Sequence, residues 1–172
     1  MVVALALALG ACTTAMPPGP EQDRATLDEF RHEMTAFARK TGDYREQARH
    51  GSNPSEMTLG WFIYDLLTVL SSQDDALYQH FNPQGRDLQS YLRTVFRNHQ
   101  AEEVDAIEAL SRIDHPTRRL AARYGLEVLR HIPDPAEPKE TQAADRRDLA
   151  DALDILQKLL QRSAEEVVLP PP

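Results

Sequence analysis

The sequence WFIYDLLTVL at residues 61–70 is apolar around most of a helical circumference. In the helix that contains this stretch and continues past it, the polar positions form only a thin line, made by Asp65, Thr68 and Ser72. A helix with so little polar surface is normally covered by neighbouring helices on most sides. The stretch therefore predicts a helical protein in which this segment is central.

Helical patterns continue on both sides of this segment, and almost no stretch alternates as a strand does. The first pattern has an apolar stripe with spacings of three and four residues, formed by Leu27, Phe30, Met34, Phe37, Tyr44 and Ala48. The expected helices cover 23–50, 53 to beyond 70, a short piece at 75–81, and then 85–113, 116–132 and 141–166. We predict an all-α fold, an antiparallel bundle of four long helices plus a short accessory helix.

Local motifs suggest where the first two helices begin and bend. Thr26 to Glu29 fits a capping box for the first helix, and Gly42 is a candidate break or kink within it. For the second helix, Asn53 is the expected N-cap, Pro54 the first helical residue and Glu56 the third.

Composition places the chain among folded globular proteins. Of its 172 residues, 41% are hydrophobic and 27% are charged. The formal net charge of −8 argues against a nucleic-acid partner, because binding to phosphates depends on Lys and Arg. We expect no nucleic-acid binding.

The N-terminus is different in character from the rest of the chain. Residues 1–11 read MVVALALALGA, too short to span a bilayer, which takes roughly 20 apolar residues. They match the apolar core and small-residue cleavage site of a signal peptide. Leu9, Gly10, Ala11 and Cys12 then resemble the lipobox of bacterial lipoproteins, and Cys12 is the only cysteine in the chain.

This resemblance implies a division of the chain and a location. Residues 1–11 would be the signal peptide, 12–22 the lipidated Cys12 with a flexible tether, 23–166 the helical domain and 167–172 a disordered tail. In the sorting rule of enteric lipoproteins, Asp directly after the lipidated cysteine retains the protein at the inner membrane. Thr13 occupies that position here, so the resemblance implies the periplasmic side of the outer membrane.

His99 and Glu103 are the polar residues that stand out within the helical domain. They lie one helical turn apart in the middle of an apolar face made by Leu88, Leu92, Val95, Ile107 and Leu110. Burial of either side chain alone would be costly, so we expect them to bond to each other or to a neighbouring helix. Tyr64 and Asp65 are candidate partners.

Three interpretations of this pair remain open. It is a structural pair, the polar floor of a ligand pocket with Trp61 and Tyr91 as walls, or a catalytic His–Glu dyad. We expect no metal: Glu29 and His32 have a suitable spacing, but His32 lies nearly opposite the apolar stripe of its helix. We also expect no cofactor, because phosphate-loop and nucleophile motifs are absent from the sequence.

The turn before residue 116 carries matched charges. Asp105 and Glu108 precede it, and Arg118, Arg119 and Arg123 follow it. In an antiparallel hairpin these side chains would form a solvated charged seam. The alternative is a basic patch that recognises an anionic group.

Together these features favour a non-enzymatic interaction lipoprotein of the bacterial envelope, acting as an assembly factor, adaptor, inhibitor or immunity-type protein. Its partners would be the membrane, through the N-terminal lipid, and an envelope protein. The alternatives are a small-molecule or metal-binding bundle that uses the His99/Glu103 region, and an enzyme with a site that carries no known motif.

Overall fold

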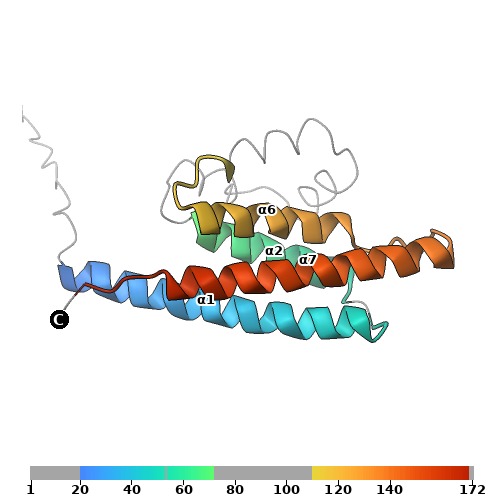
Figure 1. Ribbon diagram of the computed structural model, residues 1–172, viewed down its shortest axis with the longest axis horizontal. Helices are drawn as coiled ribbons and strands as arrows, with labels where there is room; N and C mark the ends of the chain where they lie inside the picture. Colours follow the sequence, from blue (N-terminus) through green and yellow to red (C-terminus); the bar gives the residue numbers. More distant parts are fainter. Residues whose placement is uncertain (1–19, 53, 72–109, 171–172) are drawn as a thin grey trace, which may run out of the picture.

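The computed structural model describes residues 20–52, 54–71 and 110–170. This part of the chain is helical and contains no strand, which confirms the all-α prediction. Its helices are α1 (Pro20–Arg49), α2 (Glu56–Ser71), α6 (Pro116–Arg130) and α7 (Lys139–Glu165) (Figure 1). The segments 75–81 and 85–109, where we expected a short and a long helix, lie outside the described residues.

The described helices pack around a shared core. Helix α7 lies along α1 and also packs on α6. Helix α2 packs mainly on α6 and also contacts α1. Neighbouring helices run in opposite directions (Figure 1). The largest side chains that are fully buried between them are Met34, Leu59, Ile63, Leu66, Leu110, Val128, Leu149, Leu153, Leu156 and Leu160.

Helix α2 is the segment with which the sequence analysis began. Its buried face is formed by Leu59, Phe62, Ile63, Leu66, Leu67 and Leu70. Gly125 of α6 lies against this face, and a Cβ at that position would be in van der Waals contact with Ile63, 3.4 Å from its Cγ2. The opposite side carries Asp65 and Trp61, whose side chain is 45% exposed. The wide apolar face is buried as predicted; of the predicted polar line, Asp65 is exposed, Thr68 is half-buried and Ser72 lies outside the described residues.

The predicted start of α2 is wrong by two residues. Pro54 and Ser55 precede the helix, which begins at Glu56. The Ser55 hydroxyl accepts a hydrogen bond from the backbone N–H of Thr58 at 3.1 Å, so Ser55 is the N-cap. The sequence holds two good capping residues two positions apart, Asn53 and Ser55 on either side of Pro54, and the local pattern favoured the wrong one.

Helix α1 is continuous and starts at Pro20, inside the segment assigned to the tether. Thr26 lies within the helix, so the capping-box interpretation is wrong. Gly42 does not interrupt the helix either. A Cβ at Gly42 would lie 2.6 Å from Nε2 of Gln157 on α7, so the glycine makes room for a close contact between the two helices.

The C-terminal segment differs from the disordered tail that we expected. Val167 is buried, Leu169 packs against the core, and the carbonyl of Pro170 accepts a hydrogen bond from Arg24 at 3.2 Å. Figure 1 shows this segment running beside the first turns of α1. Residues 167–170 are therefore part of the folded domain.

The last two helices begin and end within two residues of the prediction. Helix α6 begins at Pro116 as expected, and His115 is its N-cap. Helix α7 begins after the proline-rich segment 133–138, two residues before the expected start. Among the helices of the described part, none is both long and apolar enough to span a membrane.

Candidate functional site

The predicted pocket falls only partly within the described residues. Trp61 and Tyr64 lie on α2 with their rings edge to face and 6.3 Å between centroids. Asp65 lies beside them on the exposed side of α2. The surrounding protein partly desolvates its carboxyl group and raises its pKa, and Lys40 acts in the opposite direction. His99, Glu103 and Tyr91 lie outside the described residues, as does Cys12.

The three arginines after residue 116 do not form one basic patch. The guanidinium of Arg118 stacks on the Phe30 ring, 4.2 Å from its centroid, and desolvation lowers the pKa of Arg118. Arg123 lies on the exposed side of α6. Arg119 turns back to donate to the carbonyls of Ile113 and Asp114, at 2.8 and 3.2 Å. Their predicted partners, Asp105 and Glu108, lie outside the described residues.

Glu166 joins the end of α7 to the start of α6. Its carboxylate accepts a hydrogen bond from Arg162 at 2.6 Å and lies 3.7 Å from Nε2 of His115. Hydrogen bonds from Thr117 and Arg162 lower the pKa of Glu166. We interpret this cluster as structural, because it fixes the two helix ends to each other.

A groove of about 490 Å³ runs between α6 and α7 on the surface. Two large apolar side chains are exposed in it, Leu120 of α6 at 44% and Ile155 of α7 at 38%. The rest of the lining consists of Arg123, Tyr124, Glu127, His131, Asp148, Asp151 and Ala152. This α6–α7 groove combines an apolar floor with charged edges, which is the usual composition of a surface that binds another protein.

The charges of the α6–α7 groove are unevenly distributed. Asp148 and Asp151 are exposed, and within the described part of the chain neither has a cation at ion-pairing distance. Glu127 is paired with Arg130 at 2.9 Å. Because α6 and α7 are antiparallel, Asp148 and Asp151, which lie two turns and one turn before Ile155 on α7, gather with Glu127 toward the end of α6.

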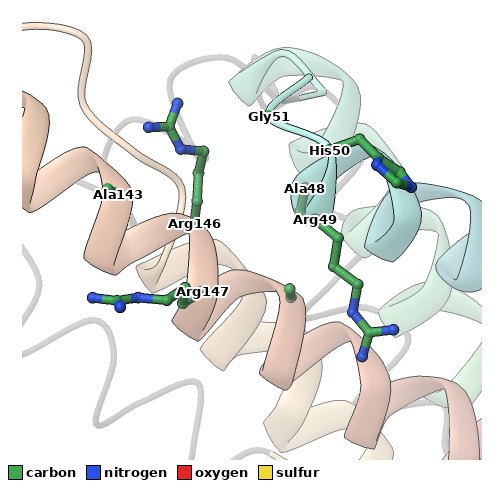
Figure 2. Close-up of a pocket in the computed structure, with 8 residues that line it drawn as sticks. Ala48, Arg49, His50, Gly51, Ala143, Arg146 and Arg147 are labelled. Carbon is green, nitrogen blue, oxygen red and sulfur yellow. The ribbon is translucent and has the colours of Figure 1, made fainter.

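A second hollow, of about 650 Å³, lies where α1 ends against the first half of α7. Its charged lining is basic and comes from both helices. Figure 2 shows Arg146 and Arg147 extending from α7, and Arg49 and His50 from the end of α1, in different directions around the hollow. The remaining lining residues are small: Ala48, Gly51, Ala143 and Ala150. We call this feature the basic hollow.

Neither surface was predicted from the sequence. The spacing of Leu120 and Tyr124 puts them on one face of α6, but only the packing of α7 adds Ile155. Likewise, Arg146 and Arg147 line the same hollow as Arg49 and His50 only once the chain has folded. Among the described residues, no three His, Cys, Asp or Glu side chains are placed to hold a metal ion.

Comparison of the chain with protein-family models, with curated proteins and with solved structures found no match.

Proposed function

We propose that this protein is a lipid-anchored, non-enzymatic interaction protein of the bacterial envelope, located on the periplasmic side of the outer membrane. The support for the anchor is the lipobox-like sequence ending at Cys12, followed by Thr13. The helices form a single antiparallel bundle in this proposal, with the segment 75–81 as its accessory helix. The bundle is a rigid support for a surface that binds an envelope protein.

The observation that carries the interaction is the α6–α7 groove. It exposes Leu120 and Ile155 on facing helices, where an isolated domain would leave two large apolar side chains in water. Complete burial of such a side chain contributes about 1.5–3 kcal/mol, so covering the exposed parts of Leu120 and Ile155 contributes roughly 1 kcal/mol each.

The groove also defines the chemistry of its partner segment. Leu120 and Glu127 are seven residues apart on α6, which corresponds to about 10 Å along the helix axis. A complementary helix would place apolar side chains over Leu120 and Ile155, and Lys or Arg one to two turns further on, near Asp151 and Asp148. We therefore propose a basic amphipathic helix of the partner as the occupant.

A designed peptide tests this proposal. The probe is an 18-residue helix with leucine on one face and lysine on the other, and its control replaces lysine with glutamate. Titration of the full-length protein should show binding of the lysine peptide only. Leu120→Gln with Ile155→Gln should weaken this binding about tenfold or more, as expected for the loss of interface anchors. Val168→Gln is the matched control, because Val168 is 83% exposed elsewhere.

The same surface can be probed in cells. A photo-crosslinking residue at position 120 or 155 should form an adduct with one defined envelope protein, and one at position 168 should not. Asp148→Lys with Asp151→Lys should abolish the adduct. Equal binding of both peptides, or adducts independent of position and charge, would contradict the proposed docking surface.

A further inference from the structure

The basic hollow exists because α7 begins beyond the point where the neighbouring helix α1 ends. Helix α1 ends at Arg49, and the first turns of α7 continue past that end (Figure 1). Further along α7, Asp154 and Gln157 contact Arg45 on α1 at 2.7 and 2.9 Å. Helical spacing extends this same face of α7 through Ala150 to residues 143, 146 and 147. The face of α7 that packs on α1 therefore extends beyond the end of α1. There the same face is uncovered and forms one wall of the hollow.

After the end of α1, Gly51 lies in a turn. Its φ of +77° is a left-handed conformation that favours glycine, and it turns the chain away after α1. No atom within 4 Å would meet a Cβ at Gly51. The small side chains of Ala48, Ala143 and Ala150 leave the space between the two helices open.

The charge of the hollow is opposite to that of the whole protein. Its lining contains three arginines and His50 and no acidic residue, in a chain with a net charge of −8. Glu46 is near Arg49 and His50, at 3.5 and 3.8 Å. Arg146 and Arg147, in contrast, have no carboxylate at ion-pairing distance within the described part of the chain. Two guanidinium groups are therefore available to an external anion.

The arrangement of these cations indicates what kind of anion fits. A single phosphate would need donors that converge on one point, whereas the four basic side chains extend in different directions around a hollow of about 650 Å³ (Figure 2). Arginine binds phosphate oxygens with two parallel N–H donors, and its long stem can reorient toward a ligand. We propose that the basic hollow binds a polyphosphorylated ligand, one that carries several phosphate groups.

Calorimetry of the full-length protein with sodium tripolyphosphate tests the proposal. Tripolyphosphate should bind, orthophosphate should bind at least tenfold more weakly, and the affinity for tripolyphosphate should fall as salt is raised, because the contacts are ionic. Arg146→Gln with Arg147→Gln should weaken binding about tenfold or more, since two charge-assisted contacts are lost. Arg39→Gln with Arg112→Gln changes the net charge equally at exposed positions outside the hollow and should leave binding unchanged.

A second variant separates this site from general charge effects. Ala143→Glu puts a carboxylate into the lining at an exposed helical position, and it should abolish binding while circular dichroism stays that of the wild type. Absence of tripolyphosphate binding, or equal losses in the two arginine pairs, would overturn the proposal. Binding to phosphatidylglycerol vesicles without binding to tripolyphosphate would also overturn it, since that would indicate a membrane-binding surface.

Discussion

At the scale of single residues, Gly42 makes room for the end of the Gln157 side chain between α1 and α7. A Cβ there would lie 2.6 Å from the amide nitrogen of Gln157, whose Oε1 accepts a hydrogen bond from Arg45 at 2.9 Å. Gly42→Leu should lower the free energy of unfolding by about 1–3 kcal/mol, because a large side chain would force the helices apart. Urea denaturation measures this change.

The matched control for Gly42 uses alanine. In a Gln157→Ala background the obstructing amide is gone, and Gly42→Ala should then stabilise the protein by about 0.5–1 kcal/mol through helix propensity. Tolerance of leucine without loss of stability would show that the helices are not in close contact at this position.

Asp154 provides a second residue-scale prediction. Its carboxylate accepts hydrogen bonds from Lys158 at 2.6 Å and from Arg45 at 2.7 Å, and these bonds hold the pKa of Asp154 below its usual value. The side chain is 24% exposed, so water screens the pairs only in part. Asp154→Asn should cost about 1 kcal/mol at pH 7.

The pH dependence of this effect has a definite sign. A carboxyl group whose pKa is lowered by folding stabilises the native state above its unfolded pKa, about 3.9, and loses that contribution as the pH falls through the folded pKa. The stability difference between wild type and Asp154→Asn should therefore shrink as the pH is lowered from 5 toward 2. A difference that stays constant over this range would contradict the assigned ion pairs.

Some of these residue roles follow from the sequence and others do not. The apolar stripe of α1 was predicted. Thr41, a polar residue between Phe37 and Tyr44 on the same side of the helix, is also buried, and its hydroxyl donates a hydrogen bond to the Phe37 carbonyl at 2.8 Å. The role of Gly42 was not predicted, because it depends on Gln157 in a distant part of the chain. Local patterns report which side of a helix is buried, but not which side chain lies opposite.

At the scale of elements, the N-cap of α2 is directly testable. The Ser55 hydroxyl accepts from the Thr58 N–H and lies 2.7 Å from the Thr58 hydroxyl. Ser55→Ala should reduce stability by about 0.5–2 kcal/mol, the usual cost of a lost N-cap. Ser52→Ala, at an exposed position before the helix, should have little effect in the same denaturation assay.

The C-terminal segment gives a prediction with an internal control. Val167 and Val168 are neighbours, but Val167 is 8% exposed and Val168 is 83% exposed. Val167→Ala should cost about 1–2 kcal/mol, since it removes buried apolar surface, and Val168→Ala should be nearly neutral. Equal effects of the two substitutions in thermal or urea unfolding would contradict the packing of this segment and would support the disordered tail predicted from the sequence.

The elements were more predictable than their ends. Apolar periodicity located α1, α2, α6 and α7, because burial repeats with the helical period. The starts of α1 and α2 were misplaced, because several residues near each one can act as a cap and the tertiary contacts decide among them. The proline-rich end of the chain looked disordered, yet Arg24 and the core hold it in place.

At the scale of the whole molecule, α1 extends over 30 residues, or about 45 Å. Its N-terminal end at Pro20 follows Cys12, the proposed lipid attachment, by eight residues in the sequence, and the basic hollow is at its opposite end. In the proposed arrangement, the hollow and the membrane anchor are thus at opposite ends of α1. Both surface sites combine residues of two helices, so periodicity within one helix could not reveal either site.

The anchor at Cys12 underlies the proposed function, and mass spectrometry of the mature protein tests it most directly. The protein isolated from bacterial membranes should begin at Cys12 and carry a diacylglyceryl group on its sulfur. Cys12→Ser should keep the protein out of the membrane fraction. A mature protein that retains residues 1–11, or an unmodified Cys12 in a protein that still sediments with membranes, would contradict the account.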